Sequence, residues 1–133
     1  MDTPGGLGAL RSLDYTMLLC DDVAMMRAFY ADVLGLDVQR EVPGRYVELR
    51  VGSATLALRR RGRPYDGPAP LAASASVQLA FRVPPNDVDI AAAQLVAGGA
   101  ELLEPVRSFP EFGHRAVFFA DPEQNVIEIY AEV

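Results

Sequence analysis

The hydrophobic and polar positions along the chain predict the same order of elements twice. Residues 13–20 mix apolar residues with Tyr and Thr, which is typical of a strand, and Asp22 then offers a side-chain oxygen to begin a helix. Apolar residues at helical spacing form one buried stripe, namely Met26, Phe29, Tyr30, Val33 and Leu34. Gly35 ends this helix, and three strand-like runs follow near 36–41, 45–51 and 54–60, with turns at Gly44 and Gly52-Ser53. The first half therefore predicts the order β-α-β-β-β.

The same order begins again after a segment without apolar periodicity. The linker covers residues 61–75 and is rich in Gly and Pro over 61–73. A strand is expected at 76–83 before Pro84-Pro85, followed by a helix that Asn86 or Asp87 caps and Gly98-Gly99 end. Its apolar stripe consists of Val88, Ala91, Ala92 and Leu95. Three further strands are predicted near 101–106, 114–120 and 125–131, and residues 121–125 form the turn between the last two.

This internal repeat predicts the fold class. One helix covers only one face of each sheet, so the other face must be covered by the other half or by a second chain, or else form a cleft. We expect a single α+β domain over residues 1–133, with a first module at about 13–60 and a second at about 76–131. The two β-α-β-β-β modules are expected to form an eight-stranded incomplete barrel with the helices outside, whose concave face is a natural site for a small molecule.

Composition narrows the classes of partner. The chain of 133 residues has a net charge of −6, and all twelve basic residues are Arg. The acidic balance argues against binding to a nucleic-acid backbone and favours a neutral or cationic partner. Cys20 is the single cysteine, which excludes an intrachain disulfide and favours a reducing compartment. The first ten residues lack a basic segment and a long apolar stretch, so no signal peptide is expected. No apolar run reaches the ~18 residues that would span a bilayer, so a cytoplasmic protein without a membrane partner is expected.

Several short motifs are arranged in an order that resembles a known superfamily. The first half carries Cys20-Asp21-Asp22, Phe29-Tyr30 and Val33-Leu34-Gly35-Leu36. The second half carries Leu79-Ala80-Phe81-Arg82-Val83, Gly98-Gly99-Ala100, Gly113-His114-Arg115, Phe118-Phe119-Ala120-Asp121-Pro122, Asn125 and Glu128. This set resembles the vicinal oxygen chelate superfamily, which includes glyoxalases, bleomycin resistance proteins and extradiol dioxygenases. Relatives usually read DPxGN at the turn, whereas Gln124 stands here in place of Gly, at a cost of about 1 kcal/mol or more if the position needs a positive φ.

The resemblance implies a divalent metal that is held from four strand positions. These positions map to Tyr15, Ala57, Gln78 and Glu128. Ala57 has no donor atom, Gln78 offers a neutral oxygen, and Tyr15 would have to lose a proton whose ordinary pKa is about 10. His114, the single histidine, is at none of these positions. Since only Glu128 is a strong ligand, we expect no metal cofactor; a divalent metal on Gln78 and Glu128 is the alternative.

Strand alternation brings the candidate ligand-binding residues onto shared faces. They are Tyr15 and Met17 in the first strand, Tyr46, Glu48 and Arg50 at 45–51, Gln78 and Arg82 at 76–83, and Glu128 and Tyr130 in the last strand. Each has two interpretations. In the first, these residues line a polar cleft. In the second, they are packing residues, inert replacements for lost metal ligands, or members of cross-strand ion pairs on an outer face.

The candidate catalytic residues, one loop and the basic cluster also have both functional and structural interpretations. Glu128 and His114 are the candidate catalytic residues, as general base or acid, although a lone histidine in a Phe/Gly/Pro loop is more often structural. The loop SFPEFGH, residues 108–114, is a candidate flap over the cleft. Arg59, Arg60, Arg61 and Arg63 form the basic cluster, which contacts a phosphate or carboxylate or, as the preferred interpretation, is a solvated strand end.

Three functional hypotheses follow. The preferred one is a metal-independent protein that binds a small organic molecule in a cleft near a dimer interface, and the net charge favours a cationic guest. The resemblance to the bleomycin resistance branch, similar in size and acidity, which sequesters its ligand without transforming it, implies an antibiotic-like guest. The alternative is a divalent-metal-dependent lyase, isomerase or dioxygenase of the same superfamily. A third is metal-free acid–base catalysis by Glu128 or His114. The resemblance and the open sheet edges also predict a C2 homodimer with two equivalent clefts.

Overall fold

The computed structural model describes residues 5–133, apart from the side chains of residues 74–76. After a 3-10 turn η1 (Gly6–Ala9), the first module consists of β1 (Tyr15–Cys20), α1 (Val23–Ala28), the π-helical turn η2 (Phe29–Val33), β2 (Asp37–Val42), β3 (Tyr46–Val51) and β4 (Ala54–Arg60). The second consists of β5 (Ser74–Arg82), the 3-10 turn η3 (Pro85–Asp87), α2 (Val88–Ala97), β6 (Glu101–Leu102), β7 (Arg107–Phe109), β8 (His114–Ala120) and β9 (Asn125–Glu132). The predicted α+β fold of two β-α-β-β-β modules is confirmed.

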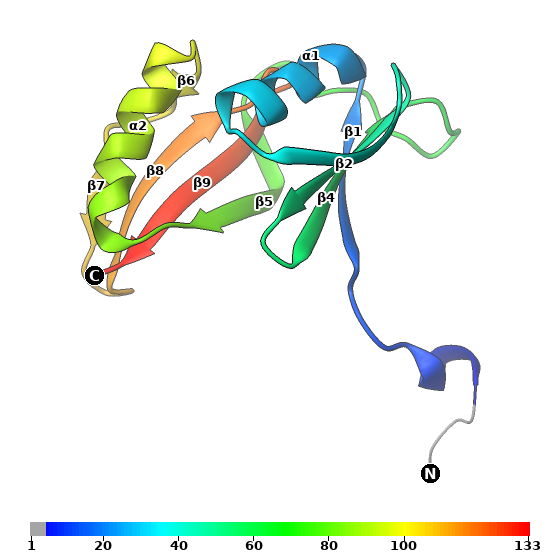
Figure 1. Cartoon of the computed structure of the whole chain (residues 1–133), viewed down its shortest axis with the longest axis horizontal. Coiled ribbons are helices and arrows are strands. Elements are labelled where there is room, and N and C mark those ends of the chain that lie inside the picture. Colours follow the sequence, from blue (N-terminus) through cyan, green and yellow to red (C-terminus); the bar gives the residue numbers. More distant parts are fainter. Residues whose placement is uncertain (1–4) are drawn as a thin grey trace.

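The two modules, which lie side by side in Figure 1, have the same sheet topology apart from one extra strand in the second. The first sheet has the order β1-β4-β3-β2 and the second β5-β9-β8-β6, with β7 paired to β8. The parallel pairs are β1 with β4 in the first sheet and β5 with β9 in the second, and the remaining pairs are antiparallel. The edge strands β1 and β5 are not paired with each other in the described part of the chain, so one chain holds two separate sheets.

Local sequence explains most element boundaries. The side chain of Asp22 accepts a hydrogen bond from the Met25 amide and caps α1 as predicted, and Gly35 has a φ of 75° where the helix ends. Asp87 occupies the position before α2, but its side chain forms no cap hydrogen bond because the turn η3 leads directly into the helix. The strand predicted at 101–106 is limited to β6, and Pro105, which has no N–H to donate, separates β6 from β7.

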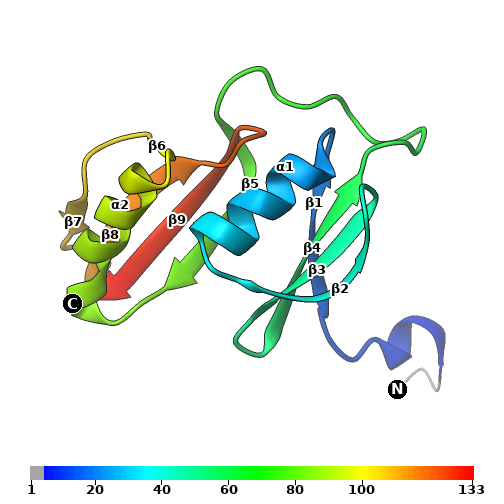
Figure 2. The same ribbon diagram turned by 45° about the horizontal axis from the view of Figure 1, so that its top comes forward.

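One cluster of buried side chains joins the helix-facing sides of both sheets. Alternation in β3 and β9 buries Val47, Leu49, Ile127 and Ile129 in it, as the sequence predicts. Figure 2 shows α1 between the two sheets, and the ring of Phe29 lies 6.2 Å from that of Phe119 on β8. The faces that carry the candidate site residues are therefore the opposite ones, turned away from the helices.

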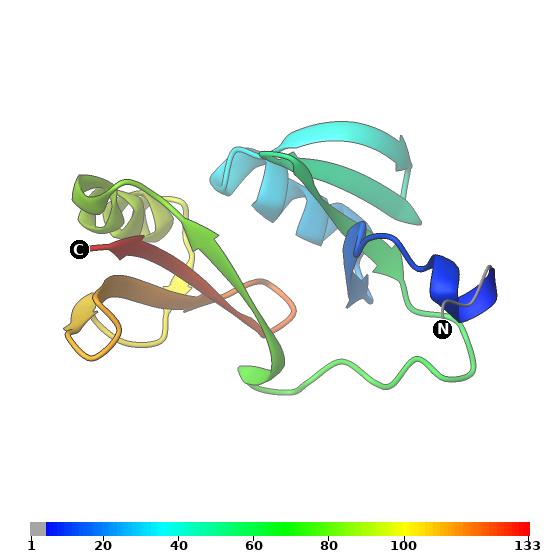
Figure 3. The ribbon, with the colours of Figure 1, turned by 90° about the horizontal axis from the view of Figure 1, so that it is seen from below.

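The turn at residues 121–125 fastens the second module to the first. Asp121 is buried and accepts hydrogen bonds from the Tyr30 hydroxyl at 2.7 Å and from the Glu123 and Asn125 amides. The carboxylate of Glu123 accepts the backbone N–H groups of Asp21 and Asp22 at 2.7–2.9 Å. Gln124 has a φ of 71°, so the turn keeps the left-handed position that relatives fill with glycine. The linker gives the covalent connection between the modules and runs along the bottom of Figure 3.

Candidate functional site

The helix-free face of the first sheet carries a buried carboxylate. Alternation in β3 turns Val47 and Leu49 toward α1 and Glu48 to the other side, where it is only 5% exposed. Its carboxylate accepts hydrogen bonds from the Tyr46 hydroxyl at 2.5 Å and from Gln39 Nε2 at 3.4 Å, and Arg40 Nε lies 3.9 Å away. These partners leave acceptor capacity on Glu48 for a further donor.

Tyr46 is held in its protonated form beside this carboxylate. Burial, followed by the hydrogen bond to Glu48 and its negative charge, raises the pKa of Tyr46 to about 12. The nearby Tyr15 raises it further. Tyr46 therefore acts as a hydrogen-bond donor to Glu48 at neutral pH and has no role as a base there.

The position that the superfamily resemblance assigns to a metal ligand in β4 lies directly beside Glu48. Ala57 is fully buried and pairs with Glu48 on β3 and with Met17 on β1. Tyr15 and Met17 stand on the same face, 46% and 45% exposed. The structure thus brings together an apolar surface and a carboxylate, which suits a partly apolar guest that donates a hydrogen bond or carries a positive charge. Arg50, exposed at one end of this face, pairs with Thr55 in register.

The corresponding face of the second sheet carries the other predicted residues. Gln78 Nε2 donates to Glu128 Oε1 at 3.0 Å, and Arg82 forms an exposed ion pair with Glu132 at 2.9 Å. Tyr130 follows Glu128 on this face and stacks on His114, with 4.6 Å between the ring centroids. In the hydrogen bonds of the described residues, Glu128 contacts Gln78 alone and Glu48 contacts only its own sheet.

His114 is placed as an aromatic packing residue. It begins β8, is half-buried, and lies between the rings of Tyr130 and Phe112. The adjoining segment is a hydrogen-bonded turn between β7 and β8, in which Phe112 and Gly113 donate to the carbonyls of Phe109 and Pro110. The predicted flap is thus a closed hairpin in this structure.

The four positions implied for a divalent metal do not fit one. Ala57 offers no donor atom, and the amide nitrogen of Gln78, which is not a metal ligand, is turned toward Glu128. Tyr15 is on the other sheet, whose edge strand β1 is not paired with β5. Over residues 5–133, apart from the side chains 74–76, no three His, Cys, Asp or Glu residues are grouped as a metal site would need.

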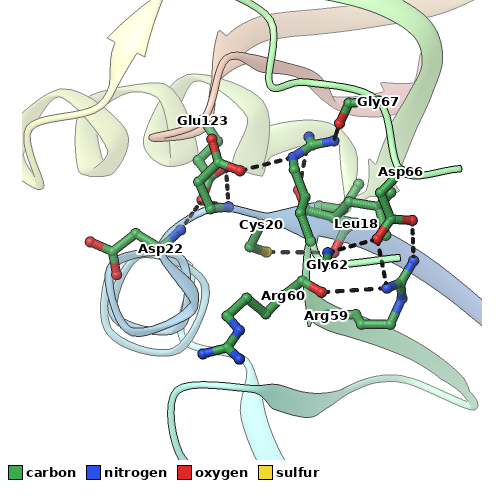
Figure 4. A network of polar contacts seen from close by, with 12 residues as sticks. Leu18, Cys20, Asp22, Arg59, Arg60, Gly62, Asp66, Gly67 and Glu123 are labelled. Carbon is green, nitrogen blue, oxygen red and sulfur yellow. Dashed lines mark hydrogen bonds and ion pairs between the residues drawn. The ribbon is translucent and has the colours of Figure 1, made fainter. Parts of the chain in front are cut away.

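A polar network at the end of β1 and β4 was not predicted from sequence, and Figure 4 shows it. Asp66 accepts two hydrogen bonds from Arg59 and one each from the Gly62 and Arg63 amides, and these interactions hold the pKa of its carboxyl well below the usual range. Cys20 is fully buried beside this network, and burial, with the charges of Glu123 and Asp121, raises its pKa to about 12. Only the glycines that flank Asp66 indicated a folded loop.

The sequence of this chain is similar to that of a known protein family. The family model for the Glyoxalase/Bleomycin resistance protein/Dioxygenase superfamily matches residues 12–129. The chain is 33% identical over 129 residues to the uncharacterized protein YwkD of Bacillus subtilis (strain 168), covering 92% of this chain and 98% of that protein. None of the helices described is long and apolar enough to cross a membrane.

Two solved structures show the same fold. Lactoylglutathione lyase from Agrobacterium tumefaciens superposes with a TM-score of 0.72 at 24% identity, over 90% of this chain and 92% of that one. A mutant of the fosfomycin resistance protein FosX from Listeria monocytogenes, complexed with Mn(II) and 1S,2S-dihydroxypropylphosphonic acid, superposes with a TM-score of 0.75 at 16% identity, over 93% and 92%. The family match over residues 12–129 and the shared two-module fold lead to one conclusion: this chain belongs to the Glyoxalase/Bleomycin resistance protein/Dioxygenase superfamily.

Proposed function

We propose that this protein binds a small organic molecule on the helix-free faces of its sheets, without a catalytic metal. The observation that carries the proposal is the pairing of Glu48 with Ala57: an almost fully buried carboxylate lies beside the position where the superfamily resemblance expects a ligand and this chain has a methyl group. A buried carboxylate that is not fully satisfied is costly, so a guest that donates to it gains binding energy.

The guest is expected to be partly apolar and to carry a cationic or hydrogen-donating group. Tyr15 and Met17 supply aromatic and thioether surface next to Glu48. Glu128 supplies a second carboxylate on the other sheet, where Gln78 orients it. The named relatives support a small-molecule role for this fold: one is a lactoylglutathione lyase, and one is a fosfomycin resistance protein with a phosphonic acid bound.

The proposal includes a C2 homodimer with two equivalent clefts. Within one chain the edges of β1 and β5 are unpaired with each other, and Tyr15 and Met17 are nearly half exposed. A second copy that places its β5 beside β1 would cover these edges and bring Glu48 and Glu128 of different chains to one cleft. Sedimentation of the purified protein at micromolar concentration tests this, and a monomer contradicts it.

The binding experiment is a thermal-shift screen with a panel of organic cations, aromatic acids and uncharged aromatic compounds. A guest that binds the folded state with a Kd one hundredfold below its concentration raises the stability by about 2.7 kcal/mol. We expect a saturable hit whose shift is lost in Glu48→Gln and kept in the control Glu101→Gln, an exposed position on β6. A hit with equal shifts in the wild type and Glu48→Gln contradicts the proposed site.

A further inference from the structure

A hollow lies at the end of β3 and β4 and shares Tyr46 with the helix-free face of the first sheet. Its volume is about 530 Å³, which falls within the range of small-molecule pockets. It is lined by Val42, Arg45, Tyr46, Arg59, Arg60, Arg61, Gly62 and Arg63. Five of the twelve arginines of a chain with net charge −6 thus converge on one place.

Two of these arginines form the walls of the hollow and are already neutralised. Arg59 forms a two-pronged pair with Asp66, at 2.8 Å and 3.0 Å. Arg61 lies 3.1 Å from the carboxylate of Asp21 and donates to the carbonyls of Gly67 and Leu19. Neither guanidinium is available as a strong anion partner without breaking these contacts.

The other three arginines have no such partners. For Arg45, Arg60 and Arg63, no carboxylate of the described residues lies within ion-pair distance, and their guanidinium groups donate no hydrogen bond in that part of the chain. Each guanidinium offers five N–H donors in a planar fork. Three arginines without ion-pair partners in the described part of the chain therefore line the same hollow.

The backbone holds two of these residues directly opposite each other. The amide of Arg60 donates to the carbonyl of Arg45 at 3.0 Å, so the two residues form the pair that follows Tyr46–Arg59 in the register of β3 and β4. Like charges directly opposite each other across two strands destabilise a sheet. Asp66 fixes the loop by accepting the amides of Gly62 and Arg63, which keeps Arg63 beside the strand pair. A bound anion would offset this repulsion.

We propose that this hollow binds a small molecule through a group with two or more negative charges, such as a phosphoryl group or a polycarboxylate. Guanidinium groups bind phosphate and carboxylate oxygens in two-pronged geometry, and three of them match a multiply charged group better than a single carboxylate. The proposal does not rest on the function proposed for the helix-free faces, since none of the three arginines belongs to that site.

The test is isothermal titration calorimetry with inorganic pyrophosphate and, separately, with citrate, at a constant ionic strength of about 0.15 M. We expect saturable binding of at least one of them, at one per chain. Arg45→Gln and Arg60→Gln each remove a charge-assisted contact and are expected to weaken binding about tenfold or more. Arg11→Gln makes the same change of net charge at an exposed residue before β1, and is expected to change the affinity less than twofold.

Three results overturn the proposal: no saturable binding of either anion, the same weakening in Arg11→Gln, or unchanged affinity in the pocket variants. Because the three side chains have no partners among the described residues, and because Arg45 and Arg60 repel each other, their replacement is expected not to lower the melting temperature, which is measured for each variant. Arg63→Gln, in the loop outside the strands, provides the same test should either strand variant unfold. Glu48→Gln is expected not to weaken pyrophosphate binding, which separates this proposal from the proposed function.

Discussion

The contact between Glu123 and the start of α1 predicts a large effect from a small change. Glu123 is 7% exposed and lies in the turn before β9, whereas the amides that it accepts belong to Asp21 and Asp22, about one hundred residues earlier. Glu123→Gln keeps the size of the side chain and replaces one carboxylate oxygen by an NH2 group, which cannot accept a hydrogen bond.

The magnitude follows from the three contacts. The Asp21 amide lies 2.7 Å from one oxygen and 2.9 Å from the other, and the Asp22 amide lies 2.8 Å from the second. In either orientation of the Gln side chain, the new NH2 group faces at least one backbone N–H donor. The hydrogen bonds that remain have a neutral amide oxygen as acceptor in place of a charged carboxylate oxygen. Hydrogen bonds to a charged group contribute about 1.5–3 kcal/mol and neutral ones about 0.5–1.5 kcal/mol. We expect Glu123→Gln to lower the free energy of unfolding by about 2 kcal/mol, and the melting temperature by roughly 6–10 °C at this chain length.

The assay is urea unfolding followed by circular dichroism at fixed protein concentration, since any dimer makes the stability depend on concentration. Glu101→Gln is the matched control and is expected to stay within about 0.5 kcal/mol of the wild type. Hydrogen exchange of the Asp21 and Asp22 amides should accelerate in Glu123→Gln only. A loss of unfolding free energy in Glu123→Gln no larger than that in Glu101→Gln would refute the view that this turn fastens the two modules together.

Three further predictions concern individual side chains. In a spectrophotometric titration Tyr46 should ionise near pH 12, and Glu48→Gln should lower this pKa. Because the pKa of Tyr46 is raised in the folded state, the stability that this group contributes is present below about pH 10 and is lost as the pH rises toward 12. A Tyr46 midpoint near pH 10 would contradict the buried pair. Cys20 should not react with a thiol reagent at pH 8 until the protein unfolds, since its folded pKa is about 12; rapid reaction in the native state would disprove its burial. Gln124→Gly should raise the free energy of unfolding by about 1 kcal/mol in urea, because the residue has a φ of 71°, and a destabilised variant would show that the Gln side chain compensates.

Local patterns were sufficient to predict the two β-α-β-β-β modules, but not that one chain holds two separate sheets. Period-two alternation assigned the facing of β3 and β9, and helical spacing found the buried stripe of α1 with Met26, Phe29 and Tyr30 at its centre. The Asp22 cap and the left-handed end of α1 at Gly35 were also accessible, because each depends on a few neighbouring residues.

Contacts between distant segments could not be predicted in this way. Alternation placed Glu48 on a polar face beside Tyr46, but its burial and its hydrogen bond from Gln39 on β2 depend on how the strands meet. The Glu123 contact joins residues about one hundred positions apart, and the arginine hollow depends on the loop that Asp66 closes. No periodicity in the sequence carries this information, since such pairings are set by tertiary packing.

The most direct test of the central claim is the metal content of the protein, measured by mass spectrometry of samples from metal-replete cultures that were purified without chelators. We expect less than about 0.1 transition-metal ion per chain and no change of melting temperature with Zn²⁺, Mn²⁺, Ni²⁺ or Fe²⁺. One metal ion per chain that disappears in Glu128→Gln would contradict the account and return this protein to the metal-dependent members of its superfamily.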